Sequence, residues 1–298
     1  MPVSPCNITI DKHGREVAGR GSAAFPIGCY QDDLSTSQIP WHWHEELEAV
    51  IVSEGTLLLG CGSEQYVIHP GEGFFINTGV LHGCWAYRSS RCRIYSIVFH
   101  PRLVGGMPDS VFFQKYLHPL MESRASGSLR LSPETPWQAA ILKHVHDAWQ
   151  AVNYEPPGYE FDVWHHLSGI IQLLHHNLPA ASEEANPKQQ RDAQRIKEML
   201  GFIHDHYSEK ITVTEIAQSA SISESECLRC FRNTVQLTPI QYLRQFRIRQ
   251  AANLLDSSSE KISVIANTCG FDDLSFFAKT FRELKGCSPS DYRNRRKE

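Results

Sequence analysis

The stretch SEKISVIANTCGFDDLSFFAKTFRELKGCSPSDYR, residues 259–293, has the periodicity of two short amphipathic helices joined by a tight turn. Apolar residues recur at helical spacing on both sides of one break: Ile262, Ile265, Ala266, Leu274, Phe277 and Phe281. Gly270 interrupts the pattern and suits a backbone position with positive φ. Asp272 or Asp273 can cap the second helix. The stretch therefore predicts a helix-turn-helix.

The same stretch resembles the signature of the AraC/XylS family of bacterial transcription regulators in residue type and spacing. The matching positions are Ile265, Ala266, Gly270, Phe271, Ser275, Phe276, Phe277, Phe281, Arg282, Gly286, Pro289, Tyr292 and Arg293. An isolated helix-turn-helix pattern is a weak signal, and its alternative is a helical hairpin in an enzyme. A match over this many positions is much more specific. The resemblance implies a DNA-binding regulator.

Length and composition are those of an ordinary soluble protein. A chain of 298 residues suggests about two domains, and its 41% hydrophobic and 21% charged residues are typical of globular proteins. We find no signal peptide and no run approaching the ~18 apolar residues of a membrane span, so we expect a cytoplasmic protein. The nine cysteines are then reduced thiols. Cys227 and Cys230 form a CxxC, but we expect them to pack as small apolar residues.

Charge is distributed unevenly along the chain. Residues 192–298 hold 16 Lys and Arg against 14 Asp and Glu, whereas the preceding residues hold 13 against 19. A mildly basic C-terminal part and an acidic remainder fit a DNA-binding module joined to a module that does not bind DNA.

Residues 25–100 contain short β-rich segments separated by Gly, Ser, Pro and Asn, which favours a sandwich or barrel. Their polar residues resemble the two cupin motifs: His42, His44, Glu48 and Gly55, followed by Gly71, Gly79 and His82. The sequence departs from those motifs at Thr36, Asn77 and Ala86, where cupins have glycine, proline and asparagine. These departures weaken an inference of catalysis but not of the fold. We therefore assign residues 1–104 to a cupin-like, effector-sensing barrel.

Three imidazoles and one carboxylate form a chemically coherent set in this barrel. His42, His44 and Glu48 share strand parity, so their side chains point to one face. Together with His82 they could hold a divalent ion such as Zn, Fe, Mn or Ni with positions left open. Alternatively they line a metal-free pocket for a polar effector. Trp41 could flank that pocket and stack on a sugar face, as could Trp43 and Trp85, or all three could be core.

Residues 105–178 have mainly helical periodicity, with an apolar stripe through Val163, Leu167, Ile171 and Leu174. The family resemblance implies that these helices pack on the barrel and pair two subunits. The alternative for the stripe is packing within one subunit. Residues 179–191 are polar, contain two prolines and read as a linker.

Residues 192–298 are expected to form seven helices with two helix-turn-helix units. Capping-box patterns at Thr212–Glu215 and Ser223–Glu226 begin two helices of the first unit. Gln236 occupies the position where the family usually has a helix-ending glycine. If this residue is left-handed, glutamine costs about 1 kcal/mol relative to glycine. A helix over residues 239–255, roughly 25 Å long, would separate two recognition helices that bind in successive major grooves.

The predicted recognition helices cover residues 223–234 and 273–284. Their outward residues, which we expect to contact DNA, are Ser225, Leu228, Arg229, Arg232, Leu274, Ser275, Phe276, Lys279 and Arg282. Arg229 can donate two hydrogen bonds to guanine. Arg232 and Arg282 are placed to meet phosphates.

These observations predict an α+β multidomain protein: a cupin-like jelly-roll barrel with following helices, then an all-α double helix-turn-helix. We expect a regulator, not an enzyme, that binds double-stranded DNA, responds to a small molecule such as a sugar, and forms a homodimer. RNA polymerase is a further candidate partner. The alternative is a cupin metalloenzyme, a dioxygenase or isomerase, with a regulatory DNA-binding tail.

Overall fold

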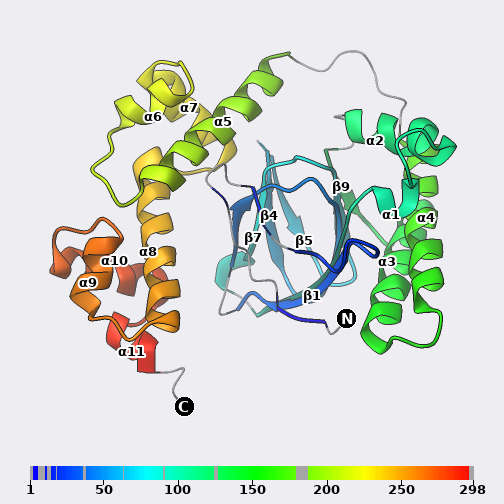
Figure 1. The fold of residues 1–298 in the computed structure, drawn as a ribbon, viewed down its shortest axis with the longest axis horizontal. Coiled ribbons are helices and arrows are strands. Elements are labelled where there is room, and N and C mark those ends of the chain that lie inside the picture. The colour runs from blue at the N-terminus through cyan, green and yellow to red at the C-terminus, as the bar shows by residue number, and fades with distance from the viewer. Residues whose placement is uncertain are drawn as a thin grey trace. The chain divides into compact units, whose positions relative to one another are not determined.

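The computed structural model of the protein describes residues 3–5, 11, 15–17, 19–35, 38–62, 64–89, 91–123, 127–178 and 187–294. The chain divides into two compact units. Described residues up to Arg191 form the first unit, except Asp11, which groups with the residues from Asp192 onward in the second. In Figure 1 the first unit combines strands and helices, and the described part of the second is helical.

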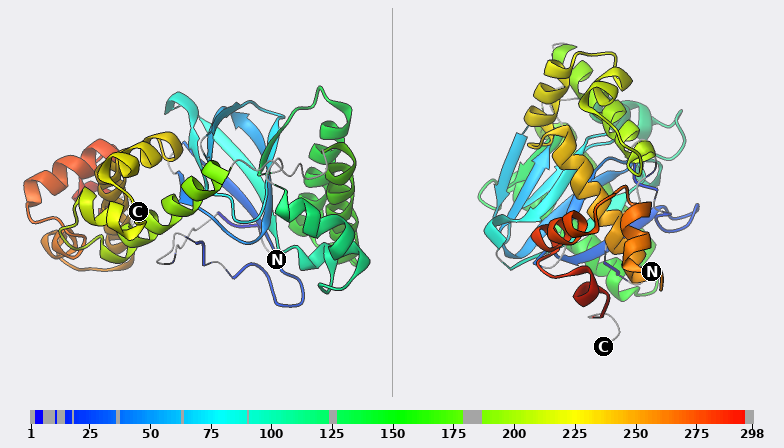
Figure 2. Two further views of the ribbon diagram at one scale, coloured as in Figure 1. Left: turned by 90° about the horizontal axis from the view of Figure 1, so that it is seen from above. Right: turned by 90° about the vertical axis from the view of Figure 1, so that its left-hand side faces the viewer.

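The described strands of the first unit form two antiparallel sheets (Figures 1 and 2). The larger sheet has the order β1 (Ile27–Asp33), β8 (Cys92–Phe99), β3 (Leu47–Gly55), β6 (Gly73–Ile76) and β9 (Ser128–Leu131). The smaller sheet has the order β2 (Ile39–His42), β7 (His82–Ala86), β4 (Leu57–Cys61) and β5 (Glu64–Ile68). This arrangement confirms the predicted cupin-like architecture.

Helices cover one face of the larger sheet. In chain order they are α1 (Arg102–Gly105), the π-helical turn η2 (Phe113–Leu117), α2 (His118–Glu122), α3 (Pro136–Tyr154) and α4 (Tyr159–Asn177), whereas the 3-10 turn η1 (Tyr87–Ser89) follows β7 of the smaller sheet. Figure 1 shows α3 and α4 side by side, and α3 contacts the strands β1, β3, β8 and β9. The long apolar faces of α3 and α4 are therefore buried against the sheet and against each other.

The stripe through Val163, Leu167, Ile171 and Leu174 is fully buried in this helix-and-sheet core. The prediction that it forms a subunit contact is therefore wrong for these residues, and the alternative of packing within one subunit is correct. Helical periodicity shows that a face must be buried, but it does not show what buries it. The large apolar side chains that α4 leaves exposed are Phe161 and Trp164.

Strand β3 separates two cores. Leu47 and Ile51 pack against the helices, whereas Val50 and Val52 pack between the two sheets. Because successive side chains of a strand point to opposite faces, Glu48 shares the inner face with Val50 and Val52. A carboxylate is thus placed inside the apolar barrel.

The seven helices that the sequence predicts for the second unit are present, although the first begins five residues before it: α5 (Pro187–His206), α6 (Val213–Ser219), α7 (Glu224–Thr234), α8 (Pro239–Ser257), α9 (Ile262–Thr268), α10 (Leu274–Lys285) and α11 (Pro289–Asn294). Helix α5 begins at Pro187, so the last part of the predicted linker 179–191 is helical. Residues 179–186 of that linker lie outside the described residues. The helix-turn-helix pairs are α6 with α7 and α9 with α10.

Side chains just before several of these helices cap their N-termini. Thr212 forms the predicted reciprocal capping box with Glu215. Ser223 accepts from the Glu226 backbone, but the reciprocal bond is not formed, because the Glu226 side chain instead pairs with arginines. Asp273 caps α10 as expected. The second predicted box is therefore only half present.

Two turn residues have the left-handed backbone that the sequence indicated. Gly270 has φ +79°, and Gln236 has φ 59° at the position after α7 where a glycine was expected. The corresponding position after α10 is Gly286, with φ 72°. The second helix of each helix-turn-helix unit is therefore followed by a left-handed residue. Glycine adopts this conformation at the lowest cost, but the first unit has glutamine there.

Candidate functional site

Strand pairing brings the four predicted donor residues together. His42 and His82 are direct cross-strand partners in the smaller sheet, with ring centroids 4.2 Å apart. His44 follows β2, and Glu48 comes from β3 in the facing sheet. One donor atom of each residue lies within 4.8 Å of those of the others. The predicted cluster therefore exists, enclosed between the sheets.

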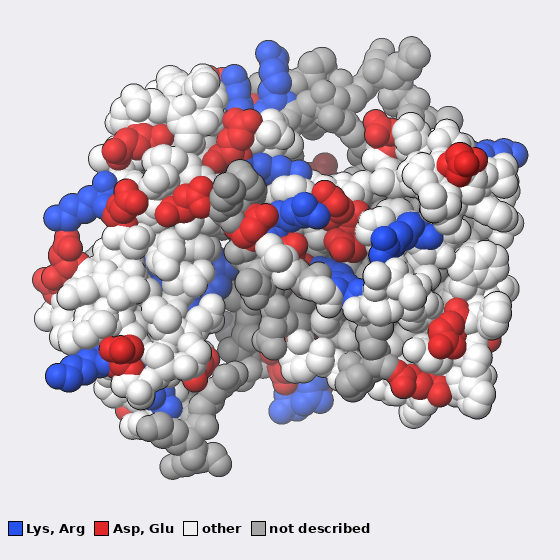
Figure 3. Space-filling view, in the orientation of Figure 1, with Lys and Arg blue, Asp and Glu red and all other residues white. Residues whose placement is uncertain are grey.

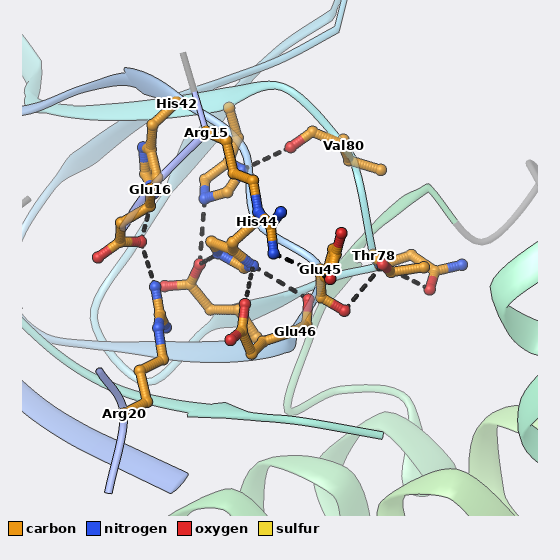
Figure 4. Close-up of polar contacts among 12 residues, drawn as sticks. Arg15, Glu16, Arg20, His42, His44, Glu45, Glu46, Thr78 and Val80 are labelled. Atoms are coloured by element: carbon orange, nitrogen blue, oxygen red, sulfur yellow. Dashed lines mark hydrogen bonds and ion pairs between the residues drawn. The ribbon is translucent and has the colours of Figure 1, made fainter. Parts of the chain in front are cut away.

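Backbone carbonyls set the orientation of each imidazole, and Figure 4 shows two of the residues that supply them, Glu46 and Val80. The Nδ1 atoms contact carbonyl oxygens two residues away: His42 with Pro40 at 2.8 Å, His44 with Glu46 at 3.0 Å, and His82 with Val80 at 2.8 Å. A carbonyl oxygen can only accept, so Nδ1 carries the hydrogen in each ring. In the neutral form, each Nε2 then presents a lone pair, and the neutral tautomers resemble those of metal-binding histidines.

Glu48 lies between two of these lone pairs. Its Oε2 atom is 3.1 Å from Nε2 of His44 and 3.1 Å from Nε2 of His82. Two acceptors do not attract each other, so each contact needs a proton or another cation between its atoms. Neighbouring donors around an ion with bonds of about 2.1 Å are about 3.0 Å apart in octahedral and about 3.4 Å apart in tetrahedral geometry, close to these separations. The donor set therefore fits a divalent metal ion.

Burial favours the neutral imidazoles. It lowers the pKa of His42 well below the ordinary value, with further lowering from His82 and His44, and it lowers the pKa of His44. For Glu48, burial opposes ionisation, but contacts with His44 and His82 outweigh it and hold the pKa well below the usual range. The ionised Glu48 carboxylate is therefore stabilised only with a proton or another cation between it and the facing imidazoles, which is an arrangement that attracts a cation.

Two residues beside the cluster were not found by sequence reasoning. The buried side chains of Glu16 and Arg20 form an ion pair, and Glu16 Oε2 lies 3.6 Å from His42 Nε2. Figure 4 shows Glu16 between His42 and Arg20. Burial raises the pKa of Glu16 to about 7, although Arg20 lowers it. These residues precede the strand-rich region in a segment without periodicity, so only the fold could bring them to the site.

Trp41 does not join the cluster. Its ring packs on Trp85, with centroids 5.4 Å apart, and a Cβ at Gly60 would lie 2.5 Å from it. Gly60 alternates with Leu59 and Cys61, which face the barrel interior, so Trp41 lies on the outer face of the smaller sheet. The expectation that Trp41 flanks the effector is therefore wrong, because Trp41 has the opposite strand parity to His42.

The departures from the cupin motifs have partly structural explanations. Asn77 donates its side-chain amide to the carbonyl of Leu120 at 2.7 Å, which ties the barrel to α2. Ala86 packs against the barrel core. Thr36 lies outside the described residues. The eight described cysteines are all free and buried, including Cys227 and Cys230.

Each of the two predicted recognition helices exposes one face that carries both polar and apolar side chains. On α7, Ser225, Leu228 and Arg232 are exposed, whereas Cys227 and Phe231 are buried. On α10 the exposed residues are Leu274, Ser275, Phe276, Lys279 and Arg282. The face of the molecule in Figure 3 intersperses acidic and basic side chains. Sequence-specific contacts would therefore depend on a few side chains on these helices.

Arg229 and Phe276 are less free than their neighbours. Arg229 Nη1 lies 3.4 Å from Asp192 Oδ2 and its Nη2 lies 3.5 Å from Glu226 Oε1. The Phe276 ring is covered by Arg244 of α8, whose guanidinium carbon lies 5.3 Å from the ring centroid. To contact DNA, Arg229 would have to keep or leave its ion pairs with Asp192 and Glu226, and Phe276 its stacking contact with Arg244.

Comparison with known proteins agrees with both units. An AraC-like ligand binding domain model matches residues 26–196, and a helix-turn-helix domain model matches residues 216–295. The chain belongs to the AraC family. It is a DNA-binding transcription regulator with a ligand-binding domain, as the resemblance of residues 259–293 predicted. None of the described helices is long and apolar enough to cross a bilayer.

AraC-family relatives match this chain along most of its length. It is 28% identical over 290 residues to the uncharacterised regulator YdeC of Bacillus subtilis (strain 168), covering 96% of this chain and 98% of that protein. It is 28% identical over 269 residues to the transcriptional activator RhaS of Klebsiella pneumoniae (strain 342), covering 88% and 90%. Among solved structures, an apo ToxT variant of Vibrio cholerae gives a TM-score of 0.45 at 11% identity, covering 92% and 98%.

Proposed function

We propose that this AraC-family protein is a cytoplasmic, homodimeric regulator that binds a specific operator through α7 and α10 and responds to a small molecule held in the barrel. The observation that carries the proposal is the pairing of two unlike features in one chain. One is a doubled helix-turn-helix with two exposed reading faces. The other is a buried cluster of His42, His44, Glu48 and His82 in a separate sensor unit.

The second unit supports reading of two major grooves by one chain. Helix α8 has 19 residues and is therefore about 28 Å long. Together with the width of the flanking helices, this length is compatible with the roughly 34 Å between successive major grooves on one DNA face. On α7 and α10, arginine and lysine can bind guanine or phosphate, while Leu228 and Leu274 can contact thymine methyl groups.

Within this function, His42, His44, Glu48 and His82 would hold a divalent metal ion. When bound, the ion would supply positive charge at the lone pairs that now face one another. The chain's own contribution is orientation, because the carbonyls of Pro40, Glu46 and Val80 fix the three rings. A sugar or related polar metabolite is an effector class to test.

Operator selection on the full-length protein tests the proposed function. Random duplexes are selected for binding, and affinity for the selected site is then measured at several salt concentrations. We expect two half-sites about one helical turn apart and affinity that falls steeply as salt rises. Absence of salt-dependent binding to every duplex would overturn the proposal, and turnover of a substrate by the metal-loaded protein would favour the metalloenzyme.

Metal content is tested separately, on protein purified without a histidine tag. Mass spectrometry should find about one divalent ion per chain, and a His42→Ala/His44→Ala double variant should lose it. The variant His165→Ala/His166→Ala removes two histidines outside the cluster and serves as the control. Equal metal content in the wild type and the double variant would exclude this cluster as the site.

A further inference from the structure

We infer that Arg20 and Glu16 are the recognition half of the effector site, and that the effector is a small 2-hydroxycarboxylate. The inference deepens the proposed function and rests on it, including the metal ion at the histidine cluster. It follows from the hydrogen-bonding capacity that these two buried side chains retain, and from the charge of the cluster.

Arg20 offers an unused donor. Its side chain is 3% exposed, and Nη2 is paired with Glu16, whereas the buried Nη1 has no hydrogen-bond partner within the described part of the structure. A buried donor without a partner costs about 1–3 kcal/mol, so its presence at a ligand site points to an absent acceptor. A planar guanidinium matches a carboxylate better than it matches any neutral group.

Glu16 offers an acceptor next to that donor. Its Oε2 atom is bound by Arg20 and lies 3.6 Å from His42 Nε2, so the carboxylate stands between Arg20 and the metal-binding cluster. A ligand that lies on Arg20 and reaches toward the cluster passes this carboxylate. An ion held at the cluster would favour the ionised form of Glu16, which accepts a hydrogen bond from a hydroxyl group, whereas a ketone oxygen would meet it acceptor to acceptor. The pair therefore selects a hydroxyl beside a carboxylate.

The net charge of the metal-loaded site favours an effector with one negative charge. Histidines bind a metal ion in the neutral form, so with Glu16 ionised and offset by Arg20, the side chains around the ion carry the single negative charge of Glu48. A divalent ion converts this to a single positive charge, which one carboxylate neutralises. The same count predicts that an anion does not bind without the ion, because the cluster is then negative. The enclosed position of His42 and His44, 3% and 1% exposed, favours a small ligand.

The test uses four three-carbon probes on full-length protein loaded with Zn²⁺ or stripped by a chelator. Lactate carries both groups, propionate lacks the hydroxyl, pyruvate replaces it by a ketone, and 1,2-propanediol lacks the carboxylate. By calorimetry, lactate should bind the loaded protein about tenfold or more tightly than each of the others. None of the four should bind the stripped protein.

Two variants separate the roles of the side chains. Arg20→Gln should lose the preference for lactate over 1,2-propanediol. Glu16→Gln should lose the preference for lactate over pyruvate, because an amide NH₂ can donate to a ketone. Arg15→Gln, which removes an exposed ion pair with Glu45 in the same segment, should change neither preference. Visible absorption of Co²⁺ bound to each variant reports whether the metal cluster is intact.

Equal binding of lactate, propionate and pyruvate would overturn the inference. Lactate binding to the metal-free protein would overturn it as well. So would unchanged lactate binding in Arg20→Gln, provided that the variant has a normal Co²⁺ spectrum. A protein that takes up no Co²⁺ would overturn it too. Salt-dependent operator binding, measured on the same samples, shows whether the proposed regulatory function survives such a result.

Discussion

Arg229 on the first recognition helix is held by Asp192 at the start of the second unit, with 3.4 Å between Nη1 and Oδ2. Glu226 contacts the same guanidinium at 3.5 Å, and Arg195 joins both acids. The network restricts the rotamers of Arg229 but adds negative charge beside the expected DNA contact. It therefore favours a precisely directed base contact over a general attraction to phosphates.

Alanine substitution should separate these two kinds of contact. Arg229→Ala should cost about 1–3 kcal/mol on the selected operator and relax specificity at one base pair. Arg232→Ala, the exposed control on the same helix, should weaken binding to all duplexes alike and reduce the salt slope by about one. Binding to the selected site and its single-base variants at several salt concentrations measures both. A uniform loss for Arg229→Ala would make it a phosphate contact.

Acid should destabilise the second unit through His204. Its ring stacks on Phe246 and its Nε2 lies 2.7 Å from the Tyr242 hydroxyl. Burial, with a smaller contribution from Arg249, lowers its pKa from 6.5 to about 3. The unfolded chain therefore binds a proton between these values that the folded chain does not. Stability should be fully present above pH 6.5 and fall below it, by up to about 1.4 kcal/mol per pH unit.

Urea unfolding followed between pH 7 and pH 5 measures this slope. His204→Gln keeps a partner for Tyr242 without the titration, so its slope should be shallower than that of the wild type. Gln194→Ala, a substitution in the same helix that removes no titratable group, is the control and should retain the wild-type slope. An unchanged slope in His204→Gln would show that other groups cause the acid sensitivity.

The ends of the two recognition helices provide a matched stability test. Gln236→Gly should stabilise the second unit by up to about 1 kcal/mol, because glycine relieves the cost of φ 59° and loses only part of this gain to unfolded-state entropy. Gly286→Gln should destabilise it by a similar amount, because φ is 72° there and a Cβ would have open space around it. Thermal unfolding followed by circular dichroism compares both with the wild type. Stabilisation by both substitutions, or by neither, would contradict this account.

Subunit pairing should depend on the exposed apolar patch of the first unit. Phe161 is 80% and Trp164 42% exposed, and together with Phe25, Leu103 and Glu160 they line an open pocket of about 380 Å³. Phe161→Ser/Trp164→Ser should shift light scattering at micromolar concentration from dimer to monomer, because exposed apolar patches commonly mark interfaces. Val264→Ser, which removes an exposed apolar residue of the second unit, should leave the dimer intact. A wild-type monomer would reject this interface.

Local patterns were sufficient to predict the second unit. Its seven helices, the capping by Thr212 and Asp273, and the left-handed residues Gly270 and Gln236 all depend on neighbours a few positions away in sequence. The four donors in the barrel were also predictable, because strand parity and motif spacing are local properties. Trp41 is the exception, and attention to its parity relative to His42 would have placed it on the outer face.

What the sequence could not show are contacts across long separations. The ion pair of Glu16 and Arg20 lies beside His42 only because the N-terminal segment folds back, with the Glu16 amide donating to the carbonyl of Trp43 at 2.8 Å. The tie between Arg229 and Asp192 likewise spans two helices. The partner of the stripe on α4 could not be deduced either, because a second subunit and a sheet of the same chain bury apolar surface equally well.

The bonds that aim the three imidazoles join residues only two positions apart on their own backbone segments. Each ring is therefore oriented by a tripeptide and not by the side chains around it. Substitutions elsewhere in the pocket can accumulate during evolution without turning the donors away from one another. Such substitutions could thus change which small molecule the pocket accepts while the three imidazoles keep their orientation.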